Sequence, residues 1–192
     1  ANPIKFANEV ANIYPLYQQD SVGNIVYDNL ENPHYDYDNP IIHDFNPIGI
    51  GEKDIYNVLT DRFLSSFGAK LTFLKDFSIQ TSLGVDYISM DETRFYNPYH
   101  GNGASVNGRS AKYAKKDVTW TTTNRLDWKK SFSNDHTITI LLGQEASKSK
   151  YDYLSTQAIN FLDDDNDNLR ASATPSGTDS YFTEKTFTSY FS

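Results

Sequence analysis

The sequence of 192 residues contains no cysteine, one methionine and two tryptophans. The absence of cysteine excludes disulfide bonds, thiolate metal sites and a cysteine nucleophile. Long apolar runs are missing as well, because the longest uninterrupted aliphatic stretch, Ile140 to Leu142, is far shorter than the roughly 18 residues that a membrane-spanning helix needs. What remains is a soluble fold or the wall of a β-barrel.

Positive charge is also scarce, since 25 acidic residues against 17 basic ones leave a formal charge of -8. The basic residues are scattered along the chain and form no surface suited to phosphates, so we expect no nucleic-acid partner. Aromatic residues, by contrast, reach 15%, with 14 tyrosines and 12 phenylalanines. This composition favours pleated sheets, in which broad rings pack across strands.

Alternation with a period of two begins at Asp61 and continues through two segments. Odd positions from 63 to 73 are mostly apolar, and the pattern resumes from 77 to 87 with its apolar residues again at odd positions. A three-residue turn over 74–76 makes Phe73 and Phe77 a flanking pair, and both belong to the apolar set. The two segments are therefore predicted to form an antiparallel hairpin.

A second pair of alternating segments covers 118–130 and 136–145, with apolar residues such as Trp120, Leu126 and Ile140 at even positions. The turn predicted over 131–135 has an odd length, which keeps both apolar sets on one face. The pattern predicts an all-β fold of antiparallel strands in four parts. Residues 1–53 form a loop region with a hairpin turn at Gly23-Asn24, 54–147 form four strands with one long loop over 91–117, 148–185 form a second long loop, and 186–192 begin a truncated strand.

Short turns at one end and long loops at the other are typical of outer-membrane barrels. A soluble β-sandwich or lectin-like domain would alternate in the same way. The polar faces, however, carry Arg62, Asp86 and Arg125 amid Ser, Thr and Gly, which suits a water-filled lumen, and Trp120 and Trp128 bracket one strand as interfacial rings would. The barrel is therefore favoured, on the condition that apolar residues such as Phe67, Leu83, Leu126 and Ile140 are not buried together in a closed core.

The dipeptides Asn32-Pro33, Asn39-Pro40 and Asn46-Pro47 recur every seven residues. Because proline removes a backbone donor and blocks helix formation, we interpret this spacing as successive turns rather than as a repeat architecture.

The acidic run at 163–168 is a candidate metal site. Asp163, Asp165 and Asp167 have the alternate spacing of a calcium loop, but Asn168 and Thr174 stand where such a loop needs Gly and Glu. A solvated loop is therefore favoured over calcium binding. The four histidines, His34, His43, His100 and His136, form no metal-binding pair, and no catalytic or cofactor motif is present, so we expect no enzyme, metal or cofactor.

The loop 93–107 holds Phe95, Tyr96 and Tyr99 together with His100 and several glycines. Exposed rings can stack on the apolar faces of sugars, so these three aromatic residues are candidate substrate contacts. The alternative is a loop that packs its aromatic rings into a miniature core of its own, and this alternative is favoured.

Segments along the whole chain carry a family likeness. They are Ala1-Asn2-Pro3, Ile13-Tyr14-Pro15-Leu16-Tyr17, Gly23-Asn24-Ile25-Val26-Tyr27-Asp28, Tyr35-Asp36-Tyr37, Asn46-Pro47-Ile48-Gly49, Arg125-Leu126-Asp127-Trp128, Leu141-Leu142-Gly143-Gln144-Glu145 and Lys185-Thr186-Phe187-Thr188-Ser189-Tyr190. Taken in order, they resemble the SusC/RagA family of TonB-linked outer-membrane transporters, although no single motif among them is diagnostic alone.

The resemblance implies a segment of a 22-stranded barrel in the outer membrane of a Gram-negative bacterium of the Bacteroidetes, embedded in the lipid bilayer and importing glycans or peptides. It also implies that the four strands within 54–147 are barrel strands, that the loop region 1–53 and the long loops over 91–117 and 148–185 are extracellular, and that the short turns are periplasmic. It implies a SusD-like surface lipoprotein as partner, and energy from TonB, ExbB and ExbD through a plug region that these residues do not include. Such a segment has no chemistry of its own. The alternative is a soluble surface or secreted β-domain that binds carbohydrate through loop aromatics, with or without calcium.

Overall fold

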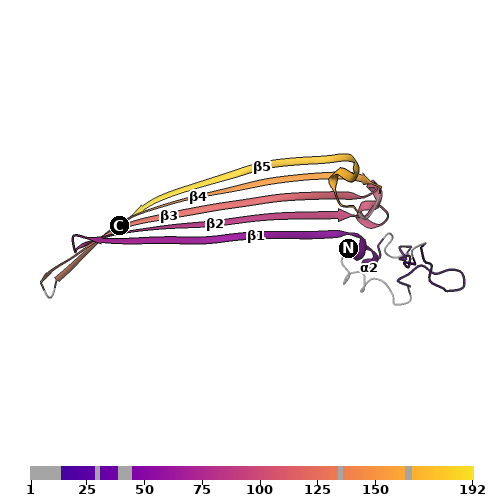
Figure 1. The fold of residues 1–192 in the computed structure, drawn as a ribbon, viewed down its shortest axis with the longest axis horizontal. Coiled ribbons are helices and arrows are strands. Elements are labelled where there is room, and N and C mark those ends of the chain that lie inside the picture. Colours follow the sequence, from indigo (N-terminus) through magenta and orange to yellow (C-terminus); the bar gives the residue numbers. More distant parts are fainter. Residues whose placement is uncertain (1–13, 29–30, 39–44, 134–135, 163–165) are drawn as a thin grey trace. The chain divides into compact units, whose positions relative to one another are not determined.

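The computed structural model describes residues 14–28, 31–38, 45–133, 136–162 and 166–192. Five strands lie side by side in one sheet in the order β1-β2-β3-β4-β5 (Figure 1). They are β1 Ile55–Phe73, β2 Phe77–Tyr96, β3 Arg109–Ser133, β4 His136–Phe161 and β5 Ser172–Phe191. The predicted all-β fold of antiparallel strands is confirmed.

Within the described residues, helical structure is confined to three short elements, which are α2 Pro47–Lys53 and the 3-10 helices η1 Gly101–Val106 and η2 Leu169–Ala171. None of the helices in the part of the chain that the structure describes has the length and apolar character that a membrane-spanning helix requires.

Contacts divide the chain into two compact units. The loop unit comprises 1–58, 92–112 and 155–178, and the sheet unit comprises 59–91, 113–154 and 179–192. Over these ranges the sequence places 6 basic and 14 acidic residues in the loop unit, against 11 of each in the sheet unit. The formal charge of -8 therefore belongs to the loop unit alone.

The two units also differ in burial. Where the structure describes burial, the buried hydrophobic residues all lie in the loop unit, and they are Ile50, Phe95, Ala111, Ala158 and Phe161. No described side chain of the sheet unit is buried, and apolar residues such as Phe67, Leu83 and Ile140 are 68%, 43% and 49% exposed. Leu126 is half-buried. The closed core that would have excluded the barrel is therefore not present in the described sheet unit.

The sheet unit has two chemically distinct faces, as the alternation predicts. The rings of Phe73 and Phe77 stack with centroids 5.7 Å apart across the turn over 74–76, and Phe77 lies 6.3 Å from Trp128 on β3. The predicted apolar sets of β1, β2 and β3 therefore share one face. Arg62 and Asp86, from the polar sets of β1 and β2, form an ion pair at 2.7 Å.

The predicted loop lengths are wrong, because the strands extend much further than the alternation does. The loop expected over 91–117 shrinks to 97–108, and the one expected over 148–185 shrinks to 162–171, so β5 begins at Ser172 and not at Thr186. At about 3.3 Å per residue, the 26 residues of β4 span roughly 85 Å. An apolar band is only about 25 Å tall, so strand ends beyond it can be polar on both faces while their backbone pairing continues.

Candidate functional site

Residues 16–28 and 31–36 of the loop unit form a small ring of three hydrogen-bonded segments. Val26 N–H donates to the Gln18 carbonyl, His34 N–H donates to the Val26 carbonyl, and Gln18 N–H donates to the His34 carbonyl, each at 2.9 Å. The three residues are eight positions apart, and three antiparallel bridges accompany them: Tyr17 with Tyr35, Gln19 with Ile25, and Tyr27 with Pro33. The hairpin turn predicted at Gly23-Asn24 is confirmed as one corner of this ring.

Aspartates at the same spacing of eight hold the turns of the ring. Asp20 Oδ1 accepts the N–H of Asn24 and Asp28 Oδ1 accepts the N–H of Asn32, both at 2.9 Å, while each asparagine side chain donates back to Oδ2 of the same aspartate. The hydrogen bond from the Asn24 backbone is the main reason that the pKa of Asp20 lies below its ordinary value. Asp36 occupies the third equivalent position. The Asn-Pro spacing of seven considered in the sequence did not predict this eight-residue repeat. The spacing of the aspartates is the sequence signal that marks it.

Helix α2 is anchored to the ring through Asn46. The Asn46 Oδ1 caps the helix by accepting two backbone N–H groups at 3.1 Å, and its Nδ2 donates to the carbonyls of Leu16 at 2.8 Å and Asp36 at 3.0 Å. Asn46 is buried as a result. The interpretation of Asn46-Pro47 as a turn is therefore wrong, because proline at the first helical position starts the helix.

Helix α2 also contacts two tyrosines, Tyr35 of the ring and Tyr37 directly after it. A Cβ at Gly49 would lie 2.7 Å from Tyr35 Cγ, so only glycine permits this approach. The Tyr35 hydroxyl donates to Glu52 Oε2 at 2.5 Å, and the ring of Tyr37 meets that of Tyr35 edge-on with centroids 6.4 Å apart. Burial, followed by the hydrogen bond to Glu52, raises the pKa of Tyr35 above its ordinary value.

Asn97, at the end of β2, organises the third wall of the site. Its backbone N–H and its Nδ2 both donate to Asp54 Oδ1, at 2.9 and 2.8 Å, and its Oδ1 accepts the N–H groups of Tyr99 and His100 at 3.0 and 2.9 Å. Asn97 is 1% exposed. The turn presents the His100 ring against Tyr37, with centroids 3.4 Å apart and the planes 8° from parallel.

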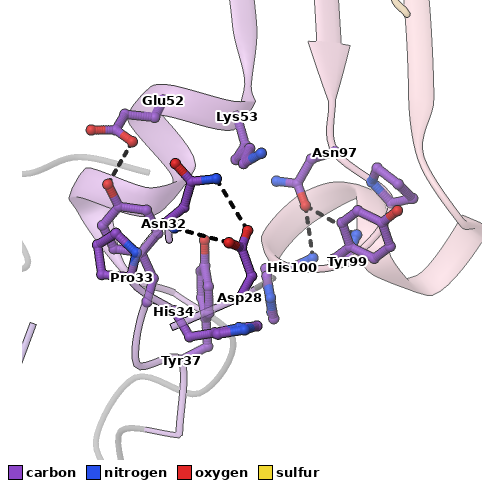
Figure 2. A pocket seen from close by; sticks show the side chains of 12 residues that line it. Asp28, Asn32, Pro33, His34, Tyr37, Glu52, Lys53, Asn97, Tyr99 and His100 are labelled. Carbon is purple, nitrogen blue, oxygen red and sulfur yellow. Dashed lines mark hydrogen bonds between the residues drawn. The ribbon is translucent and has the colours of Figure 1, made fainter. Parts of the chain in front are cut away.

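A cavity of about 820 Å³ opens between the ring, helix α2 and the turn over 97–100, all of which belong to the loop unit (Figure 2). Its lining combines aromatic rings, carboxylates and amides: Asp28, Asn32, Pro33, His34, Tyr35, Tyr37, Glu52, Lys53, Asn97, Pro98, Tyr99 and His100. His34 and His100 are thus brought together from distant parts of the sequence, whereas His136 lies at the start of β4 and His43 falls outside the described residues.

The three predicted substrate contacts of the 93–107 loop have different environments. Phe95 is fully buried and packs edge-on against Phe161, with centroids 5.3 Å apart, so the prediction of a ligand-facing ring is wrong for Phe95 and the miniature core is what the structure shows there. Tyr96 is half-buried and does not line the cavity. Tyr99 lines the cavity and is 57% exposed, so it is the residue of the three that a ligand could reach.

Of the acidic run, Asp163 and Asp165 lie outside the described residues. The Asp167 carbonyl accepts a hydrogen bond from Ser110 Oγ at 2.8 Å, and its carboxylate lies 3.6 Å from Lys112 Nζ. Among the residues with described positions, no group of three His, Asp or Glu side chains is arranged to hold a metal ion.

The sequence matches no protein-family model and no curated protein. Solved structures that are similar to the chain include the following three. The RagAB peptide importer in the "open-open" state has a TM-score of 0.69 and 19% identity over 82% of this chain, the RagAB peptide transporter has 0.68 and 17% over 86%, and the importer in the "closed-closed" state has 0.68 and 17% over 88%. The chain spans 18% of the length of each matched chain, so the likeness shows a shared fold over that portion.

Proposed function

We propose that this chain forms part of the wall of an outer-membrane β-barrel importer. The observation that carries the proposal is the apolar face of the sheet unit. Phe63, Phe67 and Leu71 belong to the apolar set of β1, and these residues are 61%, 68% and 63% exposed. In water such a face favours association, whereas against lipid tails its exposure carries no such cost.

The opposite face supports the same proposal. Arg62 and Asp86 pair there, and Thr123 Oγ1 lies 3.3 Å from Glu145 Oε2 across β3 and β4. Charged and hydroxyl side chains in a membrane protein face water-filled interiors or one another, because lipid cannot satisfy them. This face would line the interior of the barrel.

The cargo and partners are the finer part of the proposal. The similar solved structures are of a peptide importer, and the resemblance to the SusC/RagA family extends the choice to glycans or peptides. A SusD-like surface lipoprotein would cover the barrel, and TonB, ExbB and ExbD would supply energy through a plug elsewhere in the complete protein.

Uptake by cells tests this function. A strain that lacks the complete protein is expected to lose accumulation of a fluorescent peptide or glycan, and depletion of TonB is expected to abolish the accumulation that complementation restores. Undiminished uptake in both strains would contradict the proposal. The soluble carbohydrate-binding alternative predicts instead that the chain on its own binds a glycan by calorimetry without any effect of TonB.

A further inference from the structure

We infer that the cavity of the loop unit binds a basic side chain, such as the ammonium group of a lysine in a peptide. The identification of this peptide with the transported cargo rests on the proposed function. The binding site itself is argued from the cavity, its lining and the charge of its unit.

The size and rigidity of the cavity suit a ligand. Its volume of about 820 Å³ falls within the range of roughly 300 to 1,000 Å³ that ligand sites occupy. Each wall is fixed before a ligand arrives: Asn97 holds the turn that carries Tyr99, and Tyr35 is held by Glu52. Fixed walls lower the ordering cost of binding.

The lining selects for positive charge. Glu52 and Asp28 supply carboxylates, and the exposed ring of Tyr99 supplies a π face, which together are the groups that stabilise an ammonium ion. Lys53 is the one lysine or arginine among the described lining residues, so the two carboxylates outnumber it (Figure 2). An anionic ligand would meet an excess of negative charge here.

The charge of the loop unit acts in the same direction. Because the whole formal charge of -8 lies in this unit, its field attracts cations and repels anions before contact is made. At about 0.15 M salt, charges more than roughly 8 Å away are largely screened, so binding measured under those conditions reports the groups of the cavity itself.

The test is calorimetric titration of the complete protein in non-ionic detergent with the blocked peptide acetyl-Ala-Lys-Ala-Lys-Ala-amide at that salt concentration. We expect the peptide to bind, and the version with norleucine in place of lysine to bind about tenfold more weakly or worse. Equal binding of the two peptides would overturn the inference, as would binding of neither. If maltoheptaose binds, and binds equally well to the Glu52→Gln variant, the inference would also be overturned in favour of a glycan site.

Three variants locate the binding. Glu52→Gln keeps an acceptor for Tyr35 while removing the charge, and should weaken the lysine peptide about tenfold. Glu31→Gln makes the same charge change in the same unit at an exposed residue that does not line the cavity, and should stay within about twofold. Lys53→Met should tighten binding several-fold, because it removes the competing cation.

Equal losses in Glu52→Gln and Glu31→Gln would show attraction by the unit as a whole and would refute the site, and weaker binding in Lys53→Met would refute a cation site. The binding assay tests the inference and the uptake assay tests the proposed function, so the two can be refuted separately. Loss of binding with intact uptake removes the inference, whereas intact binding without TonB-dependent uptake removes the proposed function.

Discussion

Replacement of Asn97 by alanine tests whether one buried amide builds the wall of the cavity. The side chain makes three hydrogen bonds, one to the Asp54 carboxylate and two from the backbone N–H groups of Tyr99 and His100. Each hydrogen bond contributes a net of about 1 kcal/mol, and one to a charged group contributes more. Asn97→Ala should therefore destabilise the turn by about 3 kcal/mol.

This loss has a local signature in hydrogen exchange. The two accepted bonds account for about 2 kcal/mol, and each 1.4 kcal/mol is a factor of ten in the opening equilibrium, so the amides of Tyr99 and His100 should exchange on the order of 30-fold faster. Mass spectrometry of a peptide over 97–104 of the complete protein measures this. Peptides of the sheet unit should not change, because the affected contacts lie within the loop unit.

Asn57→Ala is the matched control, since Asn57 is an exposed asparagine of β1. It should leave exchange over 97–104 unchanged. Unchanged exchange in Asn97→Ala, or an equal acceleration in Asn57→Ala, would refute the assignment of Asn97 as the organising residue of this wall.

Three further predictions concern the loop unit. Gly49→Ala should destabilise this unit by about 1 to 3 kcal/mol, because the new Cβ would press on Tyr35. Gly51→Ala in the same helix has open space around the new Cβ and should be neutral or slightly stabilising. Hydrogen exchange of the α2 amides compares the two variants. Phe95→Ala should cost about 3 to 5 kcal/mol by leaving a cavity in the small core, and limited proteolysis at 97–108 should become faster; equal protection would contradict this. The raised pKa of Tyr35 means that its contribution to stability is complete below about pH 10 and is lost as the pH rises above that value. The free energy of unfolding of the loop unit, measured with denaturant, should therefore fall above this pH more steeply in the wild type than in a Tyr35→Phe variant, and an equal fall in both proteins would refute the assignment.

The hairpin of β1 and β2 could be predicted because its signal is local. Phe73 and Phe77 are four residues apart, so the parity of their apolar sets already determined that they share a face. The strand ends could not be predicted in this way. Apart from Tyr113, the residues between Arg109 and Asp117 are polar or small on both faces, and alternation reports the contrast between an apolar and a polar environment rather than backbone pairing.

The cavity depends on contacts that no local pattern encodes. Asn97 and Asp54 are 43 residues apart, and the stacking of His100 on Tyr37 joins two segments that only the fold brings together. The ring of residues 16–28 and 31–36 is the exception, since Asp20, Asp28 and Asp36 recur every eight residues and could have revealed it. Asn46 shows the remaining difficulty, because Asn-Pro fits both a turn and a helix start.

The central claim is that one face of the sheet contacts lipid and the other contacts water. Single cysteines at Thr139 and Ile140 of β4, and at Ser82 and Leu83 of β2, test it directly, because this chain contributes no other thiol. In outer membranes containing the complete protein, a water-soluble maleimide should modify positions 82 and 139, while a lipid-soluble quencher should reach labels at positions 83 and 140. Equal reactivity at neighbouring positions, or the reverse pattern, would contradict the account.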